Sequence, residues 1–157
     1  MSSANGHAPT APELLEAPNI LEYPYSRSTG PVIGAFMTAL RDGKIIGGKS
    51  PSGQVIVPPT EYDPQTSEAI SELVDVGSAG VVTTWAWVRQ PRAKHPMSEP
   101  FAWALVKLDG ADTAMLHVVK AVGPDAMRSG MRVVAKFKDE REGHIKDIEC
   151  FIAEEGK

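Results

Sequence analysis

Cysteine is almost absent from this sequence, which has 157 residues and one thiol, Cys150. A single thiol excludes an intramolecular disulfide and is typical of a reducing compartment, so we expect a cytoplasmic protein. No apolar run approaches the roughly 20 residues that a membrane-spanning helix needs, so we expect no membrane association. The first residues also lack the basic start and the apolar stretch of a signal peptide.

Motifs of known catalytic chemistry are missing as well. The sequence contains no G-x-S-x-G, no glycine-rich phosphate loop and no G-x-G-x-x-G. Its four histidines are scattered without the spacing of metal ligands, and His117 falls in a predicted strand, where a satisfied structural histidine is the default. The carboxylates Asp139, Glu140 and Glu142 cluster beside Lys138 and Arg141, which is typical of a solvated turn and not of an acid–base pair. We therefore predict no catalytic residues and no bound metal.

The first part of the chain is predicted to be an arm followed by a helix. Residues 1–29 are rich in proline, alanine, serine and asparagine, and they predict a flexible arm. A helix is predicted over residues 30–43, because Pro31 suits a first helical turn and Gly43 suits a C-terminal stop.

This helix is predicted to be amphipathic. Phe36, Met37 and Leu40 belong to an apolar stripe at helical spacing. The stripe packs either against the rest of the chain or against another protein, and the sequence leaves both possibilities open.

Residues 44–67 predict two short extended segments joined by a tight turn, then the pair Pro58 and Pro59, then a second turn. This outline is typical of a zinc ribbon, in which two C-x-x-C turns hold one metal ion. The four ligand positions carry other residues here: Lys49, Ser52, Asp63 and Thr66. We therefore predict a degenerate ribbon without its metal.

Residues 68–157 alternate with period two, which predicts a mainly β domain. Strands are expected over 70–88, 101–108, 113–120, 131–138 and 145–153, the first long and bent at its glycines. Five strands, with a short helical turn before the fourth, predict an OB-type barrel. A small β-sandwich is the alternative on pattern alone.

The two first strands of this domain alternate large and small side chains. Small residues fit the narrow interior of a barrel, which would place Trp85, Trp87 and Trp103 on a common outer surface. Exposed tryptophans on adjacent strands mark a contact site. In the equally weighted alternative, the large residues fill the core.

Basic residues gather in one proline-rich loop, at Arg89, Arg92 and Lys94. Basic groups beside aromatic rings bind single-stranded nucleic acid, or they grip the phosphates of a ligand such as coenzyme A. The formal net charge of −4 argues against binding polyanions over a broad surface.

The succession of helix, ribbon and OB-type strands resembles the zinc-ribbon/OB-fold proteins that accompany thiolases. The stretches that carry the resemblance are FMTALRDGKIIGGKSPSGQVIVPP, AGVVTTWAWV, FAWALVKLDGADTAMLHVV and PDAMRSGMRVV. The runs TTWAWVRQPRAKHP and LDGADTAMLH are similar to the OB-fold half of a hydratase subunit in steroid side-chain breakdown, which partners a lipid-transfer-protein-like aldolase.

This resemblance implies a non-catalytic accessory subunit that binds and stabilises a thiolase-like aldolase, in a heterotetramer, and helps to accommodate its acyl-CoA substrate. The reaction of the complex would be retro-aldol cleavage of a β-hydroxyacyl-CoA in cholesterol catabolism. The chain itself would bind no cofactor, and a coenzyme A thioester would be the substrate of the complex.

The resemblance and the patterns together give a set of expected contact residues. We expect partner contacts at Phe36, Met37, Leu40, Pro58, Pro59, Trp85 and Trp87, and contacts with acyl-CoA at Arg89, Arg92 and Lys94. The alternative function is an OB-fold protein that binds single-stranded nucleic acid. A stand-alone hydratase is a third hypothesis, for which the sequence offers no acid–base pair.

Overall fold

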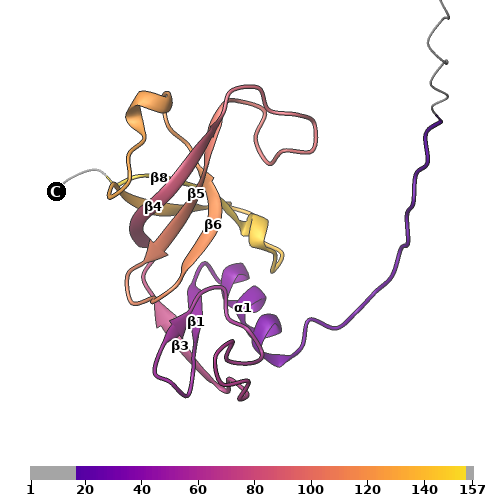
Figure 1. Cartoon of the computed structure of the whole chain (residues 1–157), viewed down its shortest axis with the longest axis vertical. Helices are drawn as coiled ribbons and strands as arrows, with labels where there is room; N and C mark the ends of the chain where they lie inside the picture. Colours follow the sequence, from indigo (N-terminus) through magenta and orange to yellow (C-terminus); the bar gives the residue numbers. More distant parts are fainter. Residues whose placement is uncertain (1–16, 155–157) are drawn as a thin grey trace, which may run out of the picture.

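The computed structural model describes residues 17–154, so residues 1–16 of the predicted arm lie outside that range. Residues 17–29 of the arm are exposed and have no regular secondary structure. They run from the start of the helix away from the rest of the protein, as the indigo trace shows (Figure 1).

Helix α1, Pro31–Arg41, confirms the helix predicted after the arm. Its first N–H groups have no partners within the helix, and the carboxylate of Glu61 accepts one of them, the N–H of Val32, at 3.2 Å. After α1, the chain turns at Gly43, whose φ of +74° is a left-handed conformation that favours glycine. Sequence punctuation thus located both ends of the helix.

A small antiparallel sheet follows α1. It consists of β1 (Ile45–Lys49), β2 (Val55–Ile56) and β3 (Glu72–Val76), in the order β2-β1-β3. The first two strands confirm the predicted pair of extended segments with a tight turn. Their close approach requires glycine, because a Cβ at Gly47 would lie 2.7 Å from the side chain of Val55.

The rest of the described chain forms a closed barrel in the order β4-β5-β6-β8-β7. Its strands are β4 (Ala79–Val88), β5 (Phe101–Leu108), β6 (Ala114–Val119), β7 (Arg132–Phe137) and β8 (Ile148–Ala153). Short 3₁₀ turns, η1 (Pro124–Ala126) and η2 (Ile145–Asp147), precede β7 and β8. The closed barrel confirms the OB fold and excludes the sandwich for this part of the chain.

The long strand predicted over residues 70–88 is two strands in two different sheets. Residues 72–76 pair with β1, and only residues 79–88 enter the barrel. The chain crosses between the sheets at Gly77, whose N–H donates to the carbonyl oxygen of Asp109 at 2.8 Å. Alternation alone did not reveal this division, because strands of both sheets have period two.

The tryptophans do not share one outer surface, contrary to the prediction. Trp85 pairs with Ala104 and Trp87 with Ala102, and cross-strand partners lie on the same face. Both alanines are buried in the barrel core, and both indoles are half-buried against it. Only Trp103 lies on the opposite face, packed edge-to-face against Phe101 at 5.4 Å.

A β-bulge between Val82 and Thr84 explains this arrangement. Val82 pairs with Val106 and Thr84 with the next residue along β5, Leu105, so Thr83 is an additional residue in β4. The alternation of β4 is therefore shifted by one after the bulge. Small residues do line the interior on β5, as predicted, and the space beside its alanines holds the indoles of β4.

The helix, the small sheet and the barrel share one core. Phe36 and Leu40 of α1 are fully buried in the same apolar cluster as Met115 and Phe151 of the barrel. The guanidinium of Arg141, in the turn before η2, also donates to the backbone carbonyl of Arg41 at 2.9 Å. The apolar stripe of the helix thus packs within the chain.

Candidate functional site

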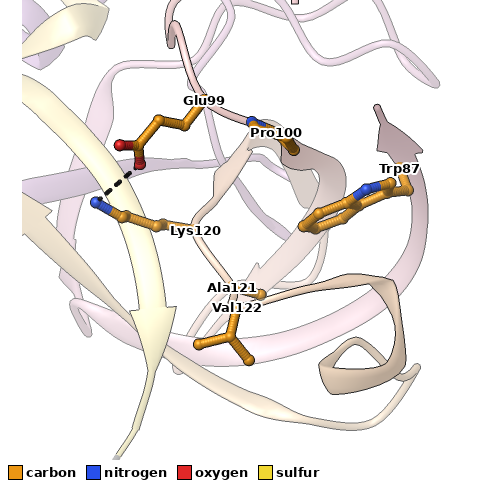
Figure 2. Close-up of a pocket in the computed structure, with 6 residues that line it drawn as sticks. All are labelled: Trp87, Glu99, Pro100, Lys120, Ala121 and Val122. Atoms are coloured by element: carbon orange, nitrogen blue, oxygen red, sulfur yellow. Dashed lines mark ion pairs between the residues drawn. The ribbon is translucent and has the colours of Figure 1, made fainter. Parts of the chain in front are cut away.

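Two hollows adjoin on one side of the barrel, and both are lined by Glu99 and Lys120. The smaller one, of about 390 Å³, is also lined by Trp87, Pro100, Ala121 and Val122. Figure 2 shows the indole of Trp87 facing this hollow, across from the ion pair between Lys120 Nζ and Glu99 Oε2 at 3.6 Å. The side chain of Val122 is fully exposed at its rim.

The larger hollow is a groove of about 1060 Å³. It lies between the loop that joins β4 to β5 and the segment that leads from β7 to β8, and its floor comes from β6. The strands β6 and β8 pair only at Val119 and Phe151, so the groove follows the least closed seam of the barrel. In OB folds the face and loops of this region are the usual place for ligands.

The walls of the groove are basic, in a chain of net negative charge. Lys94, Lys138 and Lys146 line it, and none of them forms an ion pair with a carboxylate among residues 17–154. Glu149, the groove's second carboxylate besides Glu99, is held by Lys136 at 2.7 Å. The lining of the groove therefore contains four lysines and two glutamates, Glu99 and Glu149, so positive charge is in excess.

The remaining lining is apolar, with a buried histidine. Leu116 exposes 60% of its surface in the groove, beside Trp103 and Ile145. The Nε2–H of His117 donates to the carbonyl oxygen of Ile145 at 3.4 Å. Burial lowers the pKa of His117, although this hydrogen bond acts to raise it. Its Nδ1 is buried without a partner among the described residues, so the expected satisfied histidine is only half satisfied.

One wall of the groove is fixed by a buried carboxylate. Asp147 accepts backbone N–H groups from Glu142, Gly143 and His144 at 3.1, 2.7 and 2.9 Å. Burial opposes its ionisation, but these three donors outweigh burial and lower the pKa of Asp147. The turn between β7 and β8 is thus rigid where Lys138 and Lys146 project from it.

Three of the four predicted ligand positions of the ribbon, Ser52, Asp63 and Thr66, form a hydrogen-bonded cluster, and the fourth, Lys49, does not belong to it. Asp63 is 2% exposed, and it accepts bonds from the N–H groups of Gln65 (2.7 Å) and Thr66 (3.3 Å) and from the hydroxyl of Ser52 (3.2 Å). The bond from Gln65 is the main cause of the lowered pKa of Asp63. Lys49 is exposed and pairs with Glu72 at 3.0 Å.

Across the described residues, no group of three or more histidine, cysteine, aspartate or glutamate side chains is placed to hold a metal ion. Cys150 is buried in the barrel, and burial raises the pKa of its thiol, which suits a core residue and not a nucleophile. No helix within residues 17–154 is long and apolar enough to cross a membrane.

The residues expected to contact a partner differ in burial: some are enclosed in the chain's own core and others are accessible. Phe36, Leu40 and Pro59 are buried within the chain, so their side chains are not available to another protein. Their prediction as contact residues is corrected, because the apolar stripe of α1 fills the chain's own core. Pro58 is exposed and Met37 is half-buried, and their contact with a partner stays a prediction.

The remaining expected residues lie near the two hollows. Trp87 lines the smaller hollow, while Trp85 is half-buried against the core. Of the basic residues in the loop between β4 and β5, Lys94 lines the groove, and Arg89 and Arg92 are exposed but line neither hollow.

Sequence reasoning missed Lys138 and Lys146, because Lys138 belongs to a turn interpreted as solvated and Lys146 to a predicted strand. The predicted OB topology offered a signal, since the β4–β5 loop and the β7–β8 turn of such a barrel border one ligand face.

Comparison with known proteins identifies the barrel. Residues 73–138 match the family described as ChsH2, C-terminal OB-fold domain. This part of the chain is similar to that OB-fold domain. The match begins in β3 and ends just after β7, and β8 closes the barrel in the structure.

Two relatives carry the label DUF35. A chain of the structure titled "Ltp2-ChsH2(DUF35) aldolase" is 19% identical, with a TM-score of 0.60 over 81% of this chain and 98% of that one. A DUF35 protein of unknown function from Sulfolobus solfataricus is 17% identical, with a TM-score of 0.61 over 80% and 85% of the two chains. At these identities the likeness shows that this chain shares their fold.

A curated relative is described as a "DUF35 domain-containing scaffold protein" of Pyrococcus furiosus. It is 28% identical over 90 residues, which are 57% of this chain and 65% of the relative. The match therefore spans just under two thirds of that protein's length.

Proposed function

We propose that this chain is a non-catalytic accessory subunit that binds and stabilises a thiolase-like aldolase. The observation that carries the proposal is its fold, which extends over 98% of a chain from the Ltp2-ChsH2(DUF35) aldolase structure. The name of the Pyrococcus relative, a scaffold protein, supports the same role.

The chemistry of the chain supports a role without catalysis. A nucleophile requires an adjacent base, and a general acid or base must reach the substrate from a suitable position. Within residues 17–154, the buried carboxylates Asp63 and Asp147 each accept three hydrogen bonds from residues of neighbouring turns. The lyase activity of the complex therefore belongs to the partner in this proposal.

In its finer form, the proposal is that the complex is a cytoplasmic heterotetramer. It would cleave a steroid side-chain β-hydroxyacyl-CoA by a retro-aldol reaction, and this chain would help to accommodate the acyl-CoA. Lys94 in the groove and the nearby Arg89 and Arg92 are the residues that we expect near the coenzyme A phosphates.

The smaller hollow is the surface that we propose for the partner. Trp87 is half-buried beside Pro100 and the fully exposed Val122, and half-exposed tryptophans anchored in a hollow are frequent energetic centres of interfaces. Val122 is an apolar side chain that no other described residue covers.

Co-expression with a thiolase-like aldolase tests the proposal. We expect the two proteins to co-purify, light scattering to give a heterotetramer, and cleavage of a steroid β-hydroxyacyl-CoA by the pair but not by this chain alone. Val122→Glu should release the partner, while the control Ser129→Glu, on an exposed turn away from both hollows, should not. Separate elution of the two wild-type proteins would overturn the proposal.

A further inference from the structure

We propose that the N-terminal arm of this chain closes over the chain's own groove as a strap. The structure shows residues 17–29 of the arm exposed and extended away from the rest of the protein, in an open position. In the closed position, the apolar side chains of residues 20–25 lie on the apolar floor of the groove. A closed arm competes with acyl-CoA for the groove, a consequence that rests on the proposed function, whereas the closure itself concerns the isolated chain.

The arm presents large apolar side chains to solvent in the open position. Ile20, Leu21, Tyr23 and Tyr25 each expose between 70% and 80% of their surface. Pro24 favours an extended backbone at the residue before it. Alternate residues of an extended segment share one side, so Leu21, Tyr23 and Tyr25 form one apolar side of the arm. Apolar side chains gathered in this way mark an interaction site.

The floor of the groove is an apolar surface that matches the arm. Leu116 is 60% exposed there. It pairs across strands with Leu105, and Trp103 pairs with Val118 on the same outer face of β5 and β6. An extended segment laid on this face would bury apolar surface of both the arm and the barrel, which is favourable in water.

The arm and the groove also carry opposite charge. Before Arg27, the sequence contains three glutamates, Glu13, Glu16 and Glu22, and no lysine or arginine. The lining of the groove contains four lysines and two glutamates. Opposite charges on two surfaces steer them together, more strongly at low salt. Charge and apolar character thus agree on the same occupant.

The arm is long enough to reach its own groove. The C-terminal end of α1 lies against the turn before η2, where Arg141 Nε donates to the carbonyl oxygen of Arg41 at 2.9 Å. The 11 residues of α1 span about 16 Å. Leu21 precedes Pro31 by ten residues, which extend to about 33 Å. The arm can therefore return along α1 to the groove wall at η2, and in Figure 1 it extends on the same side of the barrel as η2 and the β4–β5 loop.

Tethering favours the chain's own groove over that of a second copy. A segment joined to its site by a short flexible linker has an effective concentration of about 1 mM there. A second copy provides a comparable concentration of arms only when the protein itself is millimolar. The occupant of the groove is therefore the arm of the same chain.

Paramagnetic NMR on the full chain at low salt tests this closure. A nitroxide is attached at Asn19→Cys, and the native Cys150 is buried and stays unlabelled. We expect broadened amide signals at Leu116 and Lys146 in the groove, and unbroadened signals at Thr66 in the ribbon region. A mixture of nitroxide-labelled chains with separate isotope-labelled chains should show no broadening, because the arm docks on its own barrel.

Two sets of variants separate the apolar part of the contact from its charge. Replacing Leu21, Tyr23 and Tyr25 together by serine should abolish the broadening, while Ile20→Ser, on the other side of the extended segment, should preserve it. Lys138→Gln with Lys146→Gln should lower the ratio of closed to open arm roughly two- to thirtyfold, as expected for two exposed ionic contacts. Lys44→Gln with Arg128→Gln removes the same charge at exposed positions outside the groove and should leave the ratio unchanged.

Three results would overturn the proposal. They are the absence of broadening in the groove, broadening in the mixture of chains that equals that within one chain, and equal effects of the two pairs of charge variants. The second result would show that the arm docks on a second copy. Because these experiments contain no aldolase and no acyl-CoA, their failure is distinguishable from failure of the accessory role.

Discussion

Asp63 in the ribbon region and Asp147 in the barrel are both nearly completely buried, and both close a turn by accepting hydrogen bonds. Asp147 binds three consecutive backbone N–H groups of its own turn. Asp63 binds two N–H groups of its own turn and the hydroxyl of Ser52 in the preceding one. Asp147 therefore orders one turn, and Asp63 links two turns.

This difference shows how the ribbon region is held without a cysteine cluster. A structural metal contributes much of the folding free energy of a small zinc module. Here a carboxylate links the two turns, and the barrel supports β2, since the carboxylate of Asp112 and the hydroxyl of Thr113 accept the N–H groups of Val55 and Val57 at 2.8 Å. Support from a neighbouring domain thus accompanies the hydrogen-bonded link.

The largest expected effect comes from breaking the contact between the two regions. Leu40→Asp places an unpaired charge in the core that α1 shares with the barrel, so we expect a loss of about 4 kcal/mol or more in the free energy of unfolding. Denaturant unfolding should show one transition for the whole chain. Thr38→Asp, on the exposed face of α1, should cost much less, and a barrel that stays folded in the Leu40 variant would refute the shared core.

Asp147→Asn should have the next largest effect. The amide retains one acceptor and loses the charge, so the three N–H groups of the turn are poorly satisfied, at a cost of about 2 kcal/mol. Chemical denaturation measures this loss. Asp139→Asn, at an exposed position in the same turn, is the matched control and should be nearly neutral.

Asp63→Asn should destabilise the protein less than Asp147→Asn, because one donor is a hydroxyl that can rotate to another acceptor, such as Ser50 at 2.6 Å. Hydrogen exchange should show faster opening at Gln65 and Thr66, with unchanged protection in the barrel. Equal loss of protection in β5 and β6 would contradict a local role for this link.

Both aspartates should make stability depend on pH in the acidic range. Each has a folded pKa below its ordinary value of 3.8, so its stabilising effect is complete above that value and is lost as pH falls through the folded pKa. The difference in stability between wild type and Asp147→Asn should therefore be constant above about pH 5 and shrink below pH 4. If this difference in stability instead grew as the pH fell, the pKa of Asp147 would be raised and not lowered in the folded protein.

The smallest expected effect is that of a chelator. If hydrogen bonds of Asp63 hold the ribbon region, dialysis against EDTA should leave the thermal midpoint of wild type unchanged, and zinc should not raise it. A midpoint that falls in EDTA and recovers with zinc would show that a metal contributes to this region.

Local signals predicted most of the elements. The ends of α1 followed from Pro31 and Gly43, and the five barrel strands followed from their period-two alternation. The membership of β3 in the small sheet could not be predicted, since it depends on pairing with β1, which is distant in the sequence. The alternation within a strand predicts which residues share a face of the sheet, but not which strand pairs with it.

The candidate site was less predictable for the same reason. Lys94 was expected near a ligand, but its neighbours Lys138 and Lys146 join it only through the fold of the barrel. The smaller hollow combines Trp87 with Val122, which no motif connects. The topology of the barrel brings these separate loops together. A pattern within one stretch of sequence therefore predicts only one side of such a site.

The bulge at the additional residue Thr83 decides which face of the barrel the later side chains of β4 lie on. Regular pairing of β4 with all its residues kept and no bulge would turn Trp85 and Trp87 outward and Ala86 inward, whereas deletion of Thr83 would leave both indoles paired with the buried alanines. Proteins that keep the hollow beside Trp87 should therefore either keep this bulge or lack one residue of β4 at this point.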